Sequence, residues 1–181
     1  RGLWAPTIIG NQDQKLTIAW SESPGGRIYY SQAYERDAGK SDGWQERLPI
    51  SDIEVGGWPV IISDQANQIG LAFTAPYNED RGVYYSSYSG GSWKNRQLIQ
   101  KSAAGTFMVR DTALAVDGNH VYVTWVNSGL PPSMDALGVY FSKSDDGGRS
   151  WADPLRISFP DGDNPRILIS PSGNLHAVWT R

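Results

Sequence analysis

The sequence predicts an all-β protein made of repeated four-stranded sheets, and three observations carry this prediction. The 181 residues form short apolar runs that are punctuated by 20 Gly and 11 Pro, as in strands joined by tight turns. Aromatic residues make up 12% of the chain, with eight Trp and nine Tyr, and such residues favour strands. The same succession of landmarks also returns along the whole chain, which indicates a repeat architecture.

The repeat is defined by an aromatic residue that closes one strand of each unit. These residues are Trp20, Phe73, Trp125 and Trp179, which lie 53, 52 and 54 residues apart. A Tyr-aromatic-Ser triplet, then a Trp and then an Ile follow each of the first three. The triplets are 29–31, 84–86 and 140–142, the Trp residues are Trp44, Trp93 and Trp151, and the Ile residues are Ile50, Ile99 and Ile157. Four strands in roughly 40–50 residues are typical of one blade of a β-propeller.

Three blades and a half-blade are therefore expected, at approximately 3–51, 57–100, 109–158 and 163–181. Full blades should supply strands a to d, and the last unit only a and b. The expected strands are 7–11, 16–20, 27–32 and 44–50; 60–64, 69–74, 82–88 and 93–99; 112–116, 121–126, 138–143 and 151–157; and 166–170 and 175–180. A propeller ring that stays open leaves strand edges exposed. We therefore expect further residues of the same chain, or a partner chain, to close the propeller.

One stretch, 144–151, matches the pattern S-x-D-x-G-x-[ST]-W at every fixed position. We expect a turn between strands c and d in which Asp146 accepts hydrogen bonds from nearby backbone N–H groups. Two glycines supply the backbone angles that other residues resist, and Trp151 covers the turn. The stretch resembles the Asp-box, or BNR repeat, of the sialidase-like (neuraminidase) β-propellers. The resemblance covers nearly the whole chain and implies a propeller whose boxes lie away from the active site.

The resemblance also implies a set of candidate site residues. Sialidases bind the carboxylate of their substrate with arginines, use an Asp as acid/base and use a Tyr/Glu pair as nucleophile. The residues that fit these roles are Asp111 or Asp163 as the acid/base, Tyr77 with Glu79 as the nucleophile pair, and Arg110 and Arg166 as substrate ligands. The Phe/Tyr-Arg-Ile-Pro signature of the first sialidase arginine is absent, so none of these assignments rests on a matching family motif.

Their places in the repeat support a site at one rim of the propeller. Innermost strands line the channel of a propeller, and the d–a and b–c loops share the rim that usually holds the site. Arg110 and Asp111 stand where two other units have Trp58-Pro59 and Asn164-Pro165. Trp58 can stack on a sugar face. Each candidate also has a structural interpretation: a local ion pair for Arg110 and Asp111, packing for Trp58 and Arg166, and a solvated turn around Glu79.

Composition excludes several other classes of protein. The net charge is −3 and no run of Lys or Arg occurs, so no nucleic-acid partner is indicated. No apolar run reaches the length of a membrane span. The chain has no Cys, which excludes disulfides and thiolate metal sites. Two isolated His residues do not make a zinc site, and no cofactor or metal is expected.

Two functional classes follow for this part of a propeller. The first is carbohydrate-directed: glycan binding, or sialidase-type hydrolysis that uses the rim arginines. The alternative is a non-catalytic propeller for protein interaction or structure, within a larger extracellular or cell-surface protein. Both classes predict a location outside the cell or at its surface.

Overall fold

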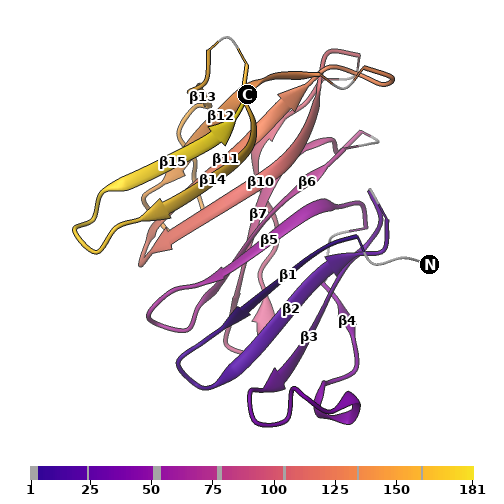
Figure 1. Ribbon diagram of the computed structural model, residues 1–181, viewed down its shortest axis with the longest axis vertical. Helices are drawn as coiled ribbons and strands as arrows, with labels where there is room; N and C mark the ends of the chain where they lie inside the picture. Colours follow the sequence, from indigo (N-terminus) through magenta and orange to yellow (C-terminus); the bar gives the residue numbers. More distant parts are fainter. Residues whose placement is uncertain are drawn as a thin grey trace.

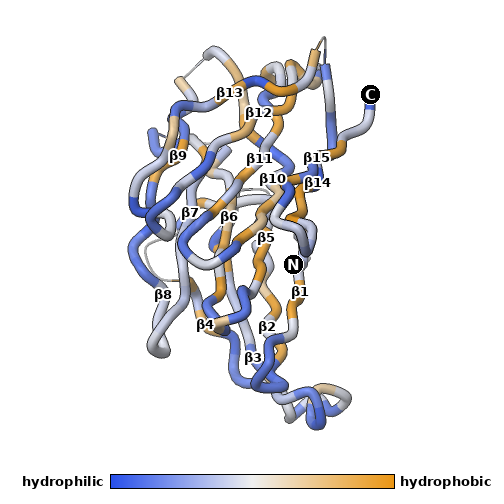
Figure 2. The backbone as a smooth tube through the Cα atoms, turned by 90° about the vertical axis from the view of Figure 1, so that its left-hand side faces the viewer, coloured by the Kyte–Doolittle hydropathy of each residue, from blue (hydrophilic) through white to orange (hydrophobic). Residues whose placement is uncertain are grey.

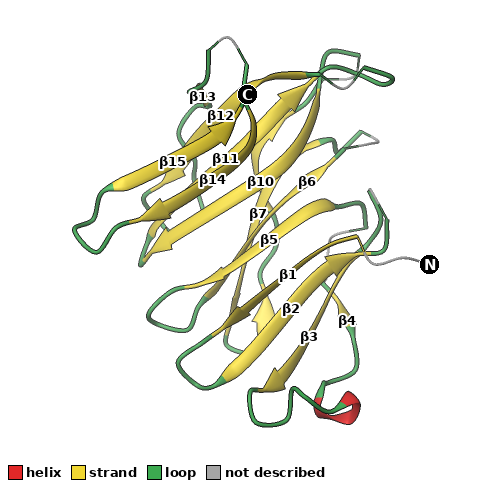
Figure 3. Cartoon of the chain, in the orientation of Figure 1, coloured by secondary structure: helices red, strands yellow, loops and turns green. Residues whose placement is uncertain are grey.

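A computed structural model describes residues 4–23, 25–50, 54–76, 79–103, 105–133, 135–159 and 161–181. This part of the chain folds into antiparallel sheets that follow one another like the blades of a propeller (Figure 1). The one helical segment within these ranges is a short 3-10 turn, Ser41–Gly43, before the outer strand of the first blade (Figure 3). The predicted all-β fold with three full blades and a half-blade is confirmed.

The sheets run from the channel outward in chain order. The first blade holds β1 (Trp4–Gly10), β2 (Lys15–Ser21), β3 (Ile28–Tyr34) and β4 (Leu48–Pro49). The second holds β5 (Gly57–Ser63), β6 (Ile69–Ala75), β7 (Gly82–Ser89), β8 (Ser92–Trp93) and β9 (Gln97–Lys101). The third holds β10 (Met108–Asp117), β11 (His120–Ser128), β12 (Ala136–Ser144) and β13 (Leu155–Arg156). The half-blade holds β14 (Asp163–Ile169) and β15 (Leu175–Thr180).

The outer strands are much shorter than the seven-residue strands that the sequence predicted. β4 and β13 have two residues each, and the second blade divides its outer strand between β8 and β9, both of which pair with β7. Prolines at Pro49 and Pro154 explain part of this difference, because proline has no N–H to donate to a ladder. The outer strand also has a neighbour on one side only, so few hydrogen bonds define it.

The inner strands are longer than the sequence predicted, because they begin three or four residues earlier. Each one contains a β-bulge near its start, where the ladder with the next strand shifts register. A bulge interrupts the regular ladder at this point, and each strand resumes its pairing on the other side of the bulge. β1, β5, β10 and β14 contact one another in this order and form the wall of the channel (Figure 1).

The hydrophobic core lies between neighbouring sheets, and the hydrophobic stretches of the chain lie mostly along the inner strands, such as β5 and β10 (Figure 2). Trp20, Phe73 and Trp125 are buried, as predicted for the aromatic that closes each strand b. The same prediction was wrong for Trp179, which is only half-buried. Its half-blade packs on the third blade, and the described residues place no sheet on its other side.

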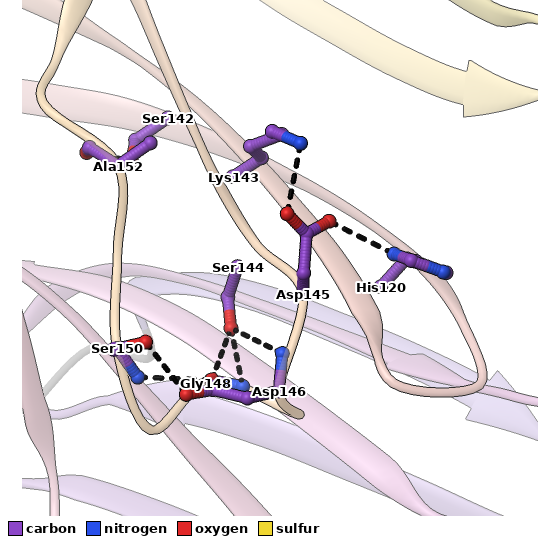
Figure 4. A network of polar contacts seen from close by, with 9 residues as sticks. All are labelled: His120, Ser142, Lys143, Ser144, Asp145, Asp146, Gly148, Ser150 and Ala152. Carbon is purple, nitrogen blue, oxygen red and sulfur yellow. Dashed lines mark hydrogen bonds and ion pairs between the residues drawn. The ribbon is translucent and has the colours of Figure 1, made fainter.

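The 144–151 turn forms the predicted network (Figure 4). Asp146 accepts hydrogen bonds from the backbone N–H groups of Arg149 and Ser150, both at 2.9 Å, and from the Ser150 hydroxyl at 2.6 Å. The Ser144 hydroxyl donates to Asp146 at 2.7 Å and accepts from the Gly148 N–H at 2.9 Å. These bonds, above all those from Ser150, hold the pKa of the Asp146 carboxyl well below its usual range.

The same turn also joins two blades. Trp151 covers it by donating from Nε1 to the Gly148 carbonyl at 3.1 Å, and the Trp151 ring meets Tyr85 of the second blade edge-on at 5.5 Å. Gly148 has a φ of +88°, and a Cβ there would overlap the Tyr85 ring. The backbone angle at this position and the close approach of the Tyr85 ring therefore both require glycine. The turn thus packs directly against the neighbouring blade.

Replacing Trp125 by Ala is expected to lower the free energy of unfolding by about 3–5 kcal/mol, because the ring is fully buried between two sheets. Trp179→Ala, at the equivalent but half-buried position, should cost clearly less. Urea unfolding of both variants measures the difference. Equal losses would contradict the assignment of Trp179 to a half-covered site.

Asp146→Ala is expected to lower the urea midpoint at neutral pH, since it removes the acceptor of four hydrogen bonds in one turn. Because the pKa of Asp146 is lowered by folding, its contribution is present above the pKa of the unfolded chain and is lost as the pH falls through the folded pKa. The unfolding curves of the variant and the parent should therefore differ at neutral pH and converge at strongly acidic pH. A pH-independent gap would contradict the prediction.

Candidate functional site

Four equivalent residues gather where the inner strands begin. Ala5, Trp58, Asp111 and Asn164 lie 53 residues apart. Their φ angles are +47°, +46°, +50° and +47°, in the left-handed region that non-glycine residues rarely adopt. Each lies within the bulge of its inner strand, and such strained conformations cluster at functional sites.

The sequence explains why the ladder breaks at these places. Pro6, Pro59 and Pro165 follow three of the four residues, and proline supplies no N–H to a ladder. The third blade has Thr112 in this place instead. The Thr112 hydroxyl donates to the Trp58 carbonyl, so β10 and β5 are joined at this point.

The four residues line one cavity of about 380 Å³ at this end of the channel. Its wall presents one carboxyl (Asp111), one amide (Asn164), one indole (Trp58) and one guanidinium (Arg166). The remaining lining residues are Ala5, Pro6, Thr7, Pro59, Val60, Thr112, Ala113, Leu114 and Ile167. The predicted rim therefore carries a real hollow with chemically varied walls.

A larger hollow of about 630 Å³ lies at the opposite end of the channel, among the turns that join strands a and b. Asp64 and Asp117 are its acidic residues. The Asp64 carboxylate is used within its own turn, where it accepts from the N–H groups of Ala66 and Gln68 at 2.8 and 2.9 Å. The walls of this second hollow are turn residues, and its Asp64 already serves to stabilise its own turn. The first cavity is therefore the better candidate site.

Arg110 holds two carboxylates from neighbouring blades. Its guanidinium makes a forked pair with Asp163 of β14, at 2.7 Å from Nη1 and 3.1 Å from Nη2. The same Nη1 contacts the Asp111 carboxylate. Only 13% of the Arg110 side chain is exposed, so the pair is partly shielded from water. This arrangement fixes the start of β10 against β14 and sets the position of Asp111.

The pKa values of the Asp111 and Asp163 carboxyl groups are shifted in opposite directions. Burial raises the pKa of Asp111, although Arg110 opposes this shift. The hydrogen bond from Arg110 lowers the pKa of Asp163. Two neighbouring carboxyl groups whose pKa values are driven apart are the usual basis for separate acid and base roles.

Trp58 and Arg166 complete the wall. The Trp58 ring meets Trp4 edge-on at 6.4 Å, and Trp4 is 40% exposed. Arg166 is exposed, and its Nη1 donates to the Pro165 carbonyl at 2.8 Å. Arg166 lines the cavity and lowers the pKa of Asp111 through its charge, although burial dominates that pKa.

Five of the seven residues that the sequence singled out are thus brought together: Arg110, Asp111, Asp163, Arg166 and Trp58. Glu79 is exposed in the connection between β6 and β7 and does not line the cavity. Tyr77 lies outside the described residues, so the nucleophile pair stays a prediction. Sequence reasoning missed Asn164 as a site residue, although its spacing of 53 from Asp111 could have found it.

Within the described ranges, no group of three or more His, Asp or Glu side chains is arranged to hold a metal ion. Nor does any helix of these ranges have the length and apolar character needed to cross a membrane.

Comparison with known proteins gives a fold but no family. No protein-family model matches the sequence, and no curated protein matches it. Among solved structures, the chain is similar to the GH43 endo-arabinanase from Bacillus licheniformis, with a TM-score of 0.61, 13% identity, and coverage of 93% of this chain and 62% of that chain. An α-L-arabinanase from Penicillium chrysogenum, complexed with arabinobiose, has a TM-score of 0.62, 12% identity, and coverage of 98% and 57%.

A third similar structure is a polysaccharide lyase of family PL25, an ulvan lyase bound to -[GlcA(1-4)Rha3S]-, with a TM-score of 0.64, 11% identity, and coverage of 94% and 49%. The chain spans less than two thirds of the length of each of these three proteins. These similarities define the class, a β-propeller shared with enzymes that act on polysaccharides. They do not support the narrower sialidase resemblance that the 144–151 turn suggested.

Asp163 and Asp111 should affect stability differently at neutral pH. Folding lowers the pKa of Asp163, so its stabilisation is present above the unfolded pKa of about 3.9 and is lost as the pH falls through the folded value. Folding raises the pKa of Asp111, so its ionisation costs the folded state at neutral pH, and this cost disappears below the unfolded pKa.

Asp163→Asn should therefore lower the free energy of unfolding at pH 7 by about 1.5 kcal/mol, the low end for a hydrogen bond to a charged group, because a third of the side chain is exposed. Asp111→Asn should leave it unchanged or raise it. Urea unfolding at pH 7 and pH 3 measures both effects. A greater loss at pH 7 for Asp111→Asn than for Asp163→Asn would contradict the assigned pKa directions.

Proposed function

We propose that the cavity at the start of the inner strands binds a carbohydrate, and that Asp111 is its acid/base residue. One observation carries this proposal. Four structurally equivalent residues, held in the same strained backbone conformation, present a methyl group, an indole, a carboxyl and an amide to one hollow. A purely structural repeat has no need of such variety at equivalent positions.

The chemistry of the wall suits a sugar. Trp58 offers an apolar face on which a sugar ring can stack. The cavity thus combines an aromatic surface with a few polar groups, as ligand sites commonly do. Asn164 and Arg166 supply hydrogen-bond donors for hydroxyl groups. Burial raises the pKa of Asp111, which is the direction that a proton donor to a leaving oxygen requires.

Hydrolysis of a glycosidic bond normally requires a second carboxylate. Asp163 is the candidate for this second carboxylate, because Arg110 contacts both Asp163 and Asp111. While Arg110 holds it by two hydrogen bonds, Asp163 acts first as a positioning residue. Glycan binding is therefore the primary proposal, and hydrolysis with Asp111 as the acid is its catalytic form.

The similar structures add support of a general kind. Two are described as arabinanases and one as an ulvan lyase with a bound uronate-containing saccharide. Sialidase-type hydrolysis is the narrower version, in which Arg166 binds a substrate carboxylate, since the donors of Arg110 are already engaged. A carbohydrate-directed propeller also favours an extracellular or cell-surface location.

A non-catalytic interaction role is the second candidate. It is favoured by large exposed apolar side chains on the half-blade and at the end of the third blade: Val178, Leu155 and Phe159 are 63%, 60% and 66% exposed. Such side chains mark surfaces that a partner can cover.

Binding of arabinan, uronate-containing and sialylated oligosaccharides by calorimetry, together with a reducing-sugar assay, tests the proposal. Trp58→Ala should weaken glycan affinity about tenfold, which corresponds to about 1.4 kcal/mol, whereas Trp58→Phe should retain it. Asp111→Asn should retain binding and reduce any hydrolysis by about 100-fold or more, the range of general acid catalysis.

Asp145→Asn is the matched control, because Asp145 is an exposed acid in the 144–151 turn, paired with Lys143 at 2.8 Å and far from the cavity in the fold. It should change neither binding nor hydrolysis. A folded protein that binds none of these saccharides, or one whose glycan affinity ignores Trp58→Ala, would overturn the proposal.

A further inference from the structure

A third hollow, here named the interblade groove, lies between the second and third blades beside the 144–151 turn. Its volume is about 440 Å³, and its walls come from β7, the outer strands of the second blade and two turns of the third blade. One of these turns follows the end of β10, whereas Asp111 lies near the start of that strand, so the groove and the first cavity are at opposite ends of the blades. The lining residues that define its chemistry are Gln68, Tyr85, Lys94, Asn119, Asp146 and Arg149.

The first pair of blades shows how the same place is filled elsewhere. Tyr30 meets Trp93 of the next blade edge-on at 5.7 Å. Tyr85 meets Trp151 of the next blade edge-on at 5.5 Å, so Tyr85 is the equivalent of Tyr30. Between the first two blades, the ring of Tyr88 also contacts Tyr30 and Trp93, at 5.9 and 5.4 Å. Burial raises the pKa of Tyr30, and the neighbouring Tyr88 adds to this shift, so the two hydroxyl groups lie close together.

In the third blade a serine stands where the second blade has Tyr88. Tyr88 and Ser144 occupy the same place in the ladder between strands b and c of their blades. The Ser144 hydroxyl donates to Asp146 at 2.7 Å and is thus engaged in its own turn (Figure 4). The side chain that fills the space between the first two blades is therefore absent between the second and third, where the interblade groove lies.

The consequence is a buried hydroxyl group without a partner. Tyr85 is only 4% exposed, and it lines the groove. Its hydroxyl forms no hydrogen bond with any residue that the structure describes. Burial raises the pKa of Tyr85, so the hydroxyl keeps its proton and can donate. A ligand oxygen in the groove would satisfy this donor, which is costly to leave unpaired.

The other polar groups of the groove favour an anionic ligand. Lys94 and Arg149 are exposed in its wall, and no ion pair of the described residues includes either of them. Asp146 is the one carboxyl group among the described lining residues, and it already accepts four hydrogen bonds within its turn. The side-chain amides of Gln68 and Asn119 form no hydrogen bond with described residues. The groove thus offers cations and free donors, but no free carboxylate.

We propose that the interblade groove binds an acidic saccharide. The anionic group pairs with Arg149 and Lys94, since an Arg guanidinium can hold an oxyanion through two parallel hydrogen bonds. A sugar oxygen accepts the hydrogen bond of the Tyr85 hydroxyl. A saccharide fits better than a small inorganic anion, because the volume is that of a ligand pocket and free amides suit hydroxyl groups. This site is separate from the first cavity and does not depend on the function proposed for that cavity.

The anionic group can be the carboxylate of a uronate or a sulfate ester, and three probes separate these sources. Tetragalacturonate, a sulfated galactan tetrasaccharide and neutral galactotetraose are each titrated into the full 181-residue protein by calorimetry. At least one acidic probe should bind saturably and about tenfold more tightly than the neutral one, because charge-assisted hydrogen bonds are the stronger kind. The tighter of the two acidic probes identifies the anionic group.

Tyr85→Phe is the most specific variant, because it removes the hydroxyl and keeps the ring that packs on Trp151. It should weaken the acidic probe about fivefold. It should not lower the urea midpoint, since the hydroxyl has no hydrogen bond within the described protein to lose. A purely structural role for the hydroxyl would give the reverse result. The matched control is Tyr88→Phe, at the preceding contact between blades, which should leave the affinity unchanged.

Lys94→Gln tests the charge. It should weaken the acidic probes about fivefold and leave the neutral probe unaffected, because it removes one cation from the wall. Lys101→Gln is its matched control: Lys101 is an exposed cation at the far end of β9 and does not line the groove. It should change the affinity for none of the probes.

Hydrogen exchange locates the bound probe. A ligand in the groove should protect the amides of the 144–151 turn, whereas a ligand in the first cavity should protect those where β5 and β10 begin. Protection confined to the starts of these inner strands would overturn this proposal while supporting the function proposed for the first cavity. The proposal also fails if neither acidic probe binds saturably to a protein that circular dichroism shows to be folded. Affinity that Tyr85→Phe leaves unchanged, or a neutral probe that binds as tightly as the acidic ones, would overturn it as well.

Discussion

The bulge at the start of each inner strand is the constraint on which the rest of this structure depends. It turns one residue per blade into the left-handed region and directs four such residues to the mouth of the channel. In three blades the bulge sacrifices no hydrogen bond from the next residue, because Pro6, Pro59 and Pro165 have no backbone N–H to donate. The blades then supply a rigid frame, while the bulged positions are free to differ in chemistry.

The third blade departs from this pattern, and the departure creates the charged part of the site. Arg110-Asp111-Thr112 replaces the proline-containing sequence of the other blades. Thr112 joins β10 to β5, and Arg110 joins β10 to β14, so Asp111 is fixed from both sides. Burial raises the pKa of Asp111 and Arg110 opposes this shift, so Asp111 combines a fixed position with a raised pKa.

Much of the fold could be predicted because each blade repeats its packing. The aromatic spacing located strand b of every blade, and the 144–151 pattern specified its turn down to the hydrogen bonds of Asp146. The short outer strands could not be predicted, because Trp and Ile landmarks record packing rather than ladder hydrogen bonds. Trp179 was misjudged for a related reason: its burial depends on a neighbouring sheet, which a local pattern does not contain.

The sequence by itself determined the repeat, the all-β class and which residues of the four units are equivalent, since these follow from periodicity and local turn chemistry. Only the tertiary structure decided that Asp111, Asn164, Trp58 and Arg166 share one cavity, and that Arg110 donates its hydrogen bonds to Asp163 and Asp111. The Arg110–Asp163 pair joins residues 53 positions apart on neighbouring blades, and the cavity gathers residues of all four units. They depend on the angle between sheets and on the bulges, and neither leaves a signal in a single strand.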